Sequence, residues 1–188
     1  MKSICTNICS VESHISEFCN HLEIELPDII CLNETLLTDK KLEKFVTLVC
    51  STTHFNNNKH ILLPTSNNVN KFRGSSIYTS LDPDLNQTKF EVPSKDHELL
   101  ALNFKSNTND KKYCVINGYL SPSITDHTKI EDFYATAAKL INKKAAKTGI
   151  IFNGDLNSKN NLIFPTKSPN YAGKILHQFL SGDPIGNT

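Results

Sequence analysis

Polar side chains able to hold a phosphate group or a cation follow directly after three apolar runs of this sequence. After residues 29–32, 115–116 and 150–152 come, respectively, Asn33 with Glu34, Asn117 with Tyr119, and Asp155 with Asn157. Carboxylate, amide and phenol groups offer oxygen ligands and hydrogen-bond donors, and oxygen ligands suit a hard cation such as Mg²⁺ or Mn²⁺. The pattern therefore predicts metal-assisted hydrolysis of a phosphate ester, with an activated water attacking phosphorus in line.

Each of these segments also has a simpler structural interpretation. Gly154-Asp155 is a common turn dipeptide, and Asn157 can cap the turn that follows. Glu34 can be the start of a solvated loop, and Tyr119 can be a packed aromatic residue. Strand ends gathered at one rim of a sheet are where α/β proteins build their sites. Because all three segments directly follow apolar runs, we favour the interpretation as one site.

The elements that would position these residues alternate between strands and helices. Apolar runs predict strands at residues 3–9, 28–32, 75–81, 98–104, 112–120 and 150–153. Apolar residues at helical spacing predict helices over residues 11–22 and 130–141, the second capped near residues 125–128, and a third after Asn170 that ends before Gly182. We expect the three strands between residues 75 and 120 to be antiparallel neighbours.

Length and composition indicate one soluble globular domain. The chain has 188 residues, of which 38% are hydrophobic and 21% are charged. The 20 Lys and Arg against 19 Asp and Glu give a net charge of +1, so nucleic-acid binding would need a local cluster of lysines together with Arg73. Two layers of sheet faced by helices would satisfy the burial of the apolar runs.

The cysteines and the chain opening bear on the cellular compartment. The six cysteines form no C-x-x-C pair, which favours reduced thiols over a zinc site. The opening MKSICTNICS has no sustained apolar core, and no segment approaches the roughly 20 apolar residues that span a bilayer. We therefore expect an intracellular protein, cytoplasmic or nuclear.

Four blocks in order resemble the endonuclease/exonuclease/phosphatase superfamily, and most closely the endonuclease domain of non-LTR (LINE-type, apurinic-endonuclease-like) retrotransposons. The blocks are SICTN (3–7), PDIICLNETLL (27–37), VINGYLSP (115–122) and IIFNGDLN (150–157). Weaker similarities are RGSSIY (73–78) and NYAGKIL (170–176). Asn33 stands where the family has Gln. The blocks keep their order and spacing over nearly the whole chain.

The resemblance implies a fold and a set of roles. The fold is α/β (α+β): a two-layer β-sandwich of mixed, largely antiparallel sheets flanked by helices, as in DNase I, forming a single domain over residues 1–188. Five residues would form the catalytic and metal-binding set and two would bind substrate. Glu34 would be the metal ligand, and Asn7 would assist at the metal and phosphate. Asp155 would orient or activate the water, Asn157 would hold the scissile phosphate, and Tyr119 would donate to a phosphate oxygen. Asn117 and Arg73 would contact the substrate.

The family pattern continues beyond this sequence. It ends in an S-D-H block whose Asp and His complete the site, whereas this chain reaches Thr188 first, and none of the seven histidines is placed to replace that His. The resemblance therefore implies a domain incomplete at its C-terminus, with its last strands missing and its activity impaired.

Several functions stay open at this point. The first is Mg²⁺- or Mn²⁺-dependent nicking of DNA for target-primed reverse transcription, with the reverse transcriptase domain of the same element as partner in the full-length parent. The others are an inactive partial domain, a phosphatase of the same superfamily that acts on a small phosphorylated substrate, and an α/β domain whose Asn and Asp residues serve only in turns.

Overall fold

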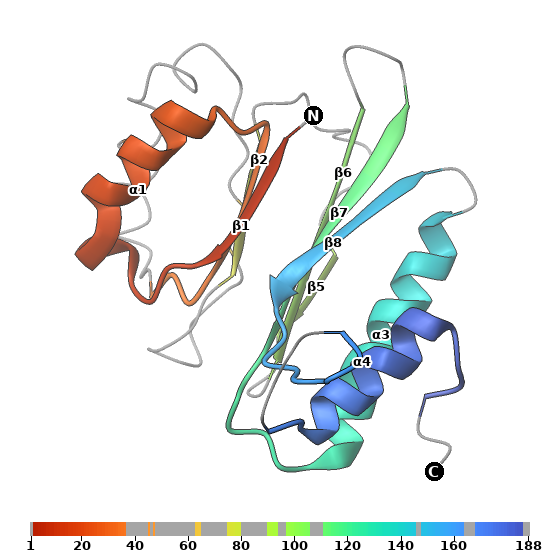
Figure 1. Ribbon diagram of the computed structural model, residues 1–188. Coiled ribbons are helices and arrows are strands. Elements are labelled where there is room, and N and C mark those ends of the chain that lie inside the picture. The colour runs from red at the N-terminus through yellow and green to blue at the C-terminus, as the bar shows by residue number, and fades with distance from the viewer. Residues whose placement is uncertain are drawn as a thin grey trace.

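Two β-sheets lie face to face with helices on their outer sides (Figure 1). The computed structural model describes residues 2–36, 45, 47, 63–64, 75–79, 90–93, 97–105, 111–145, 148–163 and 168–185. Within these residues each sheet has four strands. The architecture is the α+β sandwich of the DNase I type that the sequence predicts, with α1 outside one sheet and α3 and α4 outside the other.

The first sheet contains a parallel strand pair joined by a helix. In chain order its elements are β1 (Ser3–Asn7), α1 (Val11–Glu25), β2 (Ile29–Asn33), β3 (Leu63–Pro64) and β4 (Ser76–Thr79), and the strand order is β1-β2-β4-β3. β1 and β2 run parallel, with Asn7 opposite Asn33. α1 ends where Leu26 takes a left-handed conformation (φ 46°) and its N–H donates to the Leu22 carbonyl at 2.9 Å, one residue before Pro27.

The second sheet is built in the same way around another parallel pair. Its elements are β5 (Phe90–Pro93), β6 (His97–Lys105), β7 (Lys112–Leu120), α3 (His127–Ala145), β8 (Gly149–Asp155) and α4 (Tyr171–Ser181), and the strand order is β5-β6-β7-β8. β7 and β8 run parallel, with Tyr119 opposite Asp155. In the part of the chain that the structure describes, no helix combines the length and apolarity needed to cross a bilayer.

Among the described residues, apolar side chains form one layer between the sheets, a second beneath α1 and a third beneath α3 and α4. The layer between the sheets consists of Ile29, Cys31, Ile77, Leu100, Leu102, Phe104 and Val115. Alternate residues of β2 face opposite ways: Ile29 and Cys31 join this layer, whereas Ile30 and Leu32 pack with Phe18 of α1. A strand buried on both faces reads as an unbroken apolar run, which explains the sequence IICL.

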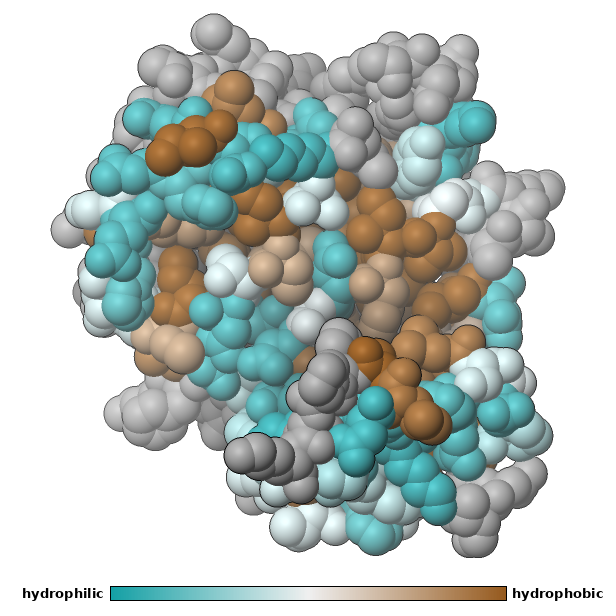
Figure 2. All heavy atoms as spheres, viewed as in Figure 1, coloured by the Kyte–Doolittle hydropathy of each residue, from teal (hydrophilic) through white to brown (hydrophobic). Residues whose placement is uncertain are grey.

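The outermost strands of the described sheets are less buried than the inner ones. Every residue of β2 is buried, whereas β1 has exposed and half-buried positions. Ile150 to Phe152 of β8 are also only half buried, and Figure 2 shows hydrophobic side chains gathered over this strand. The edge positions of β1 and β8 within the described sheets account for this difference.

The predicted helices are confirmed, and one predicted strand arrangement is wrong. The side chain of Asp126 accepts from the N–H of Thr128 at 3.0 Å at the start of α3, within the predicted capping segment. β4, however, pairs with β2 and β3 in the first sheet, whereas β6 and β7 pair with each other in the second. Strand patterns specify which face is buried but not which strand lies alongside, and sequential strands are neighbours only about two-thirds of the time.

We predict that Leu100→Ala lowers the free energy of unfolding by about 2–5 kcal/mol, because it leaves a cavity between two packed sheets. Leu100 is fully buried, whereas Leu162 is 79% exposed and provides a control of the same chemistry. Urea unfolding followed by circular dichroism measures both variants. A loss for Leu100→Ala as small as that for Leu162→Ala would contradict the assignment of this layer as the core.

We also predict that Cys31 makes stability fall at alkaline pH. Burial raises the pKa of the Cys31 thiol from 9.0 to about 12. In the unfolded chain the thiol ionises near its ordinary pKa, so its contribution to stability is complete below pH 9.0 and is lost as pH rises toward 12. The difference in unfolding free energy between the wild type and Cys31→Ala should be constant below pH 9.0 and shrink above it. A difference that stays constant across this range would disprove the effect.

Candidate active site

Four predicted site residues meet at the carboxyl ends of the two parallel strand pairs. Asn7 ends β1 and Glu34 directly follows β2 in the first sheet. Tyr119 lies next to the end of β7, and Asp155 ends β8 in the second. Because the strands of each pair are parallel, their carboxyl ends lie at the same edge, and the packing of the sheets brings the two edges together.

Two hydrogen bonds join these residues across the sheets. The Asn7 side-chain N–H donates from Nδ2 to Asp155 Oδ2 at 2.7 Å. The Tyr119 hydroxyl donates to Glu34 Oε1, also at 2.7 Å. Bonds of this length to carboxylates are charge-assisted and hold their partners firmly. Each carboxylate of the site is therefore oriented by a neutral donor from the opposite sheet.

Two buried amide side chains lie beneath this rim. Asn33 Nδ2 donates to the Gly118 carbonyl at 3.2 Å and to Ser75 Oγ at 3.1 Å. Asn117 Nδ2 donates to the Leu32 carbonyl at 3.0 Å. Both side chains are fully buried. The end of β2 and the end of β7 are thus joined by two hydrogen bonds, each from a side-chain amide of one strand to a backbone carbonyl of the other. These two bonds fix the separation of Glu34, which follows β2, and Tyr119 of β7.

Of the two residues predicted to bind substrate, the structure describes Asn117. Asn117 lies in this buried layer with its Nδ2 engaged on Leu32, so its contact with substrate stays a prediction. Arg73 falls outside the described residues.

Asn157 lies in a turn after β8, not on the strand itself. Its backbone N–H donates to Asp155 Oδ1 at 3.2 Å, and its Nδ2 donates to the Leu120 carbonyl at 2.9 Å. The Asn157 carbonyl in turn accepts from Asn170 Nδ2 at 2.8 Å. The hydrogen bond from its backbone N–H therefore keeps Asn157 next to the Asp155 carboxylate.

The sequence predicted Asn170 only as the start of a helix, whereas its side chain also donates a hydrogen bond to the Asn157 carbonyl. Its Oδ1 accepts from the Gly173 N–H at 2.8 Å, which caps α4, and from the Lys159 N–H at 2.9 Å. Asn is a preferred N-cap residue, so the cap was recognisable from sequence. The bond to Asn157 was not, because it depends on how the intervening loop folds back.

Gly154 is required where β8 passes β7. Its φ of 151° is rarely adopted by L-residues, and a Cβ atom there would lie 2.0 Å from the Gly118 carbonyl oxygen. Only glycine allows this approach. Gly154 therefore allows β8 to lie close to β7, and this approach places Asp155 at the edge of the sheet where the other site residues lie.

Backbone in the left-handed region surrounds the site. The φ values are 45° at Cys9, 92° at Ser10, 52° at Glu34 and 46° at Asn157. Such conformations cost of order 1–3 kcal/mol each in non-glycine residues and persist where surrounding contacts impose them. Here the Ser10 N–H donates to the Glu34 carbonyl at 3.0 Å, tying the turn after β1 to the turn after β2.

Cys9 is a site residue that the sequence motifs missed. Its Sγ lies 3.3 Å from Asn7 Oδ1 and 3.4 Å from Glu34 Oε2. The hydrogen bond to Glu34 raises the pKa of the Cys9 thiol, and slight burial and the negative charges of Glu34 and Asp155 raise it further. The electrostatic environment at the thiol is therefore negative, as expected where a cation is to be held.

The oxygen atoms of the site fit a hard divalent cation. Glu34 Oε2 and Asn7 Oδ1 both contact the Cys9 sulfur, at 3.4 and 3.3 Å. Among the described residues no group of three or more His, Cys, Asp or Glu side chains could hold a metal ion on its own. Mg²⁺ is commonly bound by one or two carboxylates with phosphate oxygens and water completing its shell, and Glu34 with Asn7 are the residues that could hold such a cation.

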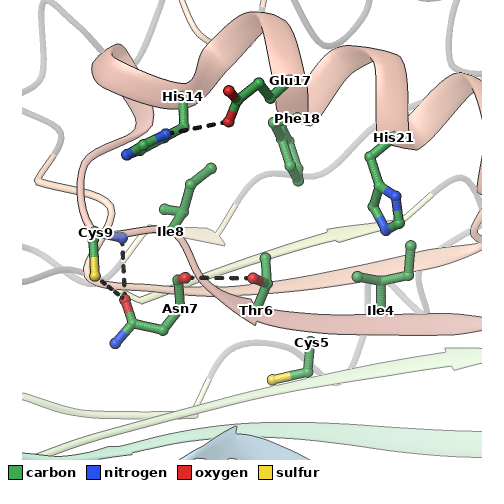
Figure 3. Close-up of a pocket in the computed structure, with 10 residues that line it drawn as sticks. All are labelled: Ile4, Cys5, Thr6, Asn7, Ile8, Cys9, His14, Glu17, Phe18 and His21. Carbon is green, nitrogen blue, oxygen red and sulfur yellow. Dashed lines mark hydrogen bonds and ion pairs between the residues drawn. The ribbon is translucent and has the colours of Figure 1, made fainter.

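A groove of about 470 Å³ opens beside the site between α1 and β1 (Figure 3). Asn7 and Cys9 line one end of it, and His14, Phe18 and His21 of α1 line the side opposite β1. The groove therefore reaches Asn7, one of the predicted site residues.

Comparison with known proteins identifies the fold. No family model matches the sequence, and neither does any curated protein. Among solved structures, D. rerio TDP2 complexed with single-strand DNA product is similar with a TM-score of 0.62 at 13% identity, over 87% of this chain and 63% of that one. The human Nocturnin catalytic domain with bound sulfate gives 0.62 at 13% identity, over 96% and 70% respectively.

A third similar structure extends the range of chemistry. The 3′ phosphatase NExo from Neisseria, bound to product DNA hairpin, has a TM-score of 0.62 at 16% identity, over 84% of this chain and 58% of that one. An endonuclease/exonuclease/phosphatase family protein from Bacteroides thetaiotaomicron is also similar, with a TM-score of 0.61. The chain thus has the DNase I-like fold of these proteins and spans 58 to 70% of the length of the three described individually.

We predict that two Asn170 variants separate helix capping from site positioning. Asn170→Ala removes both functions and should lower the free energy of unfolding by about 1–2 kcal/mol. Asn170→Asp keeps the acceptor for the Gly173 N–H but loses the donor to the Asn157 carbonyl. It should therefore lose less stability while the amide of Asn157 exchanges its hydrogen faster. Urea unfolding and residue-resolved hydrogen exchange test this, and unchanged exchange in both variants would show that Asn170 does not hold the turn.

Proposed function

We propose that this chain carries the site of a divalent-cation-dependent hydrolase that cleaves phosphodiester bonds in DNA. The observation that supports it is the convergence of Asn7, Glu34, Tyr119 and Asp155 from four strand ends. Residues that served only in separate turns would have no reason to meet. The DNase I-like fold of TDP2 and NExo, both solved with DNA, also supports DNA as the substrate class.

Asp155 is placed to accept a proton from the attacking water. Its Oδ2 is held by Asn7 Nδ2 and its Oδ1 by the Asn157 N–H, and each oxygen keeps a further lone pair. As the water oxygen bonds to phosphorus, its proton passes to Asp155, and the ester oxygen leaves on the opposite side with the electron pair of the broken P–O bond and takes a proton from solvent. The two fixed donors keep the carboxylate in position throughout this step.

Glu34 and Asn7 Oδ1 would hold the cation, which when bound neutralises charge on the phosphate oxygens. Tyr119 donates its single hydroxyl hydrogen to Glu34 Oε1 and so orients that carboxylate, and it would donate to a phosphate oxygen only after this hydrogen leaves Glu34. Asn157 would hold the scissile phosphate, as the sequence resemblance implies, and its backbone N–H is held on Asp155 Oδ1.

We further propose, from the four sequence blocks, that the physiological reaction is DNA nicking by a non-LTR retrotransposon endonuclease. The nick would leave a 3′-hydroxyl that primes reverse transcription by the partner domain of the same element. The proposed alternative in the same fold is a phosphatase, for which the 3′ phosphatase NExo is the supporting comparison. The other alternative is a partial domain that binds DNA or a cation without turnover.

We predict that the protein nicks supercoiled plasmid with Mg²⁺ and that EDTA abolishes the nicking. Glu34→Gln and Asp155→Asn should each lower the rate by about 10²–10³-fold, since each removes a charge that acts on the reacting groups. Glu23→Gln, which neutralises an exposed carboxylate on α1, is the matched control and should keep the wild-type rate. Nicking that survives in Glu34→Gln would place the activity elsewhere or in a contaminant.

The products distinguish the alternatives. Extension of the nick by a DNA polymerase shows a 3′-hydroxyl, as the endonuclease proposal requires. Release of inorganic phosphate from a 3′-phosphorylated oligonucleotide, without nicking, would favour the phosphatase. Absence of both reactions in a protein with the expected cooperative unfolding would favour the partial domain without turnover.

A further inference from the structure

The first turns of α3 and α4 present two stacked rings close to the turn that carries Asn157. The imidazole of His127 and the phenol ring of Tyr171 lie nearly parallel, with centroids 3.6 Å apart and an interplanar angle of 8°. The Tyr171 hydroxyl donates to Glu131, which lies one helical turn after His127 on α3. Tyr171 is thus held at its ring and at its hydroxyl, so the ring pair is oriented before any ligand binds.

A cavity of about 70 Å³ connects this ring pair to the candidate active site. Its lining includes both rings together with Asn157 and Leu120. Asn157 Nδ2 donates to the Leu120 carbonyl at 2.9 Å, and Asn170, the residue before Tyr171, donates to the Asn157 carbonyl at 2.8 Å. The rings therefore share a cavity with the residue that would hold the scissile phosphate.

The imidazole of His127 is open to solvent although Tyr171 covers one of its faces. His127 is exposed, whereas Tyr171 is half-buried. Packing of α3 against α4 is provided by residues deeper in the protein, such as Tyr134 and Phe179, whose ring centroids are 5.5 Å apart. The exposed imidazole adds little to that packing, so its stacked position calls for another explanation.

A fixed, solvent-exposed ring is a group on which an unpaired nucleobase stacks. Every base has a π-face, so stacking of this kind tolerates any base sequence. The cavity is too small to enclose a whole base. A base would therefore lie on the imidazole with one edge toward the cavity, where Thr125 contributes a hydroxyl to the lining.

We propose that His127, stacked on Tyr171, binds one unpaired nucleobase of the DNA strand whose scissile phosphate Asn157 would hold. The inference rests on the proposed function for DNA as the substrate class and for the place of the phosphate. It adds that the substrate has a base free to leave the stack next to the cleaved bond, as in single strands, frayed ends and mismatched sites. Such a base is already unpaired, whereas a paired base must first be taken out of the duplex at a cost in free energy.

Binding of two oligonucleotides in EDTA, where no strand is cleaved, tests this role without any turnover. One is a single-stranded oligothymidylate with a central 2-aminopurine, whose fluorescence is quenched on stacking. The other is an abasic strand of the same length and charge. The wild type should quench the first strand and bind it more tightly than the second. His127→Ala should remove the quenching and weaken binding of the first strand by about 5–100-fold, with binding of the abasic strand unchanged.

Two further variants separate loss of the ring from loss of the fold. His127→Phe keeps a flat ring at this position and should keep the preference for the strand that carries bases. His21→Ala removes an exposed histidine from α1, on the outer side of the other sheet, and should bind both strands as the wild type does.

The outcomes distinguish this role from the proposed function. Unchanged binding of both strands by His127→Ala, or equal weakening of both, would overturn base stacking and leave the hydrolase proposal standing. Loss of the base preference in His127→Phe would overturn it as well. A wild-type protein that prefers the strand with bases but nicks no plasmid would instead overturn the hydrolase and keep His127 as part of a DNA-binding site. Failure of the wild type to bind either strand would overturn both.

Discussion

Two reciprocal hydrogen bonds between buried amides and strand-end carbonyls hold the whole site together. Asn33 of β2 donates to the Gly118 carbonyl, and Asn117 of β7 donates to the Leu32 carbonyl, at 3.2 and 3.0 Å. Hydrophobic packing between the sheets is non-directional and tolerates sliding, whereas buried amides must find their partners at one register. These two bonds therefore fix the position of one sheet relative to the other at the edge where the site residues lie.

The chemistry of the rim follows from this fixed register. β1 lies next to β2 and β8 lies next to β7, so the ends of β1 and β8 also come together, and Asn7 donates a hydrogen bond to Asp155. Gly154 permits the close approach of β8 to Gly118 that brings the Asp155 carboxylate into reach. Both carboxylates are then oriented by neutral donors, which leaves their negative charge free to attract a cation or the proton of a water.

Much of the fold was predictable because its signals are local. The unbroken apolar run of β2, the amphipathic spacing of α1 and the Asn170 cap depend only on neighbouring residues, and each is where the sequence predicted it. The placement of β4 beside β2 was not predictable, because strand pairing is decided by packing at long range. For the same reason the sequence motifs identified Glu34 and Asp155 but gave no sign that Cys9 contacts Glu34.

The sequence by itself determined the identity of the chemical groups and the strand ends that carry them, since polar residues after apolar runs are a feature of local order. Only the tertiary structure decided which groups share a site and which lie beneath it. The sequence predicts that Asn117 contacts substrate, yet its side chain is fully buried. Cys9 is predicted only as one of six reduced cysteines, yet it is exposed and contacts the site oxygens. The physical reason is that side-chain direction depends on the turn geometry and on the register between the two sheets, and both are properties of residues distant in the chain.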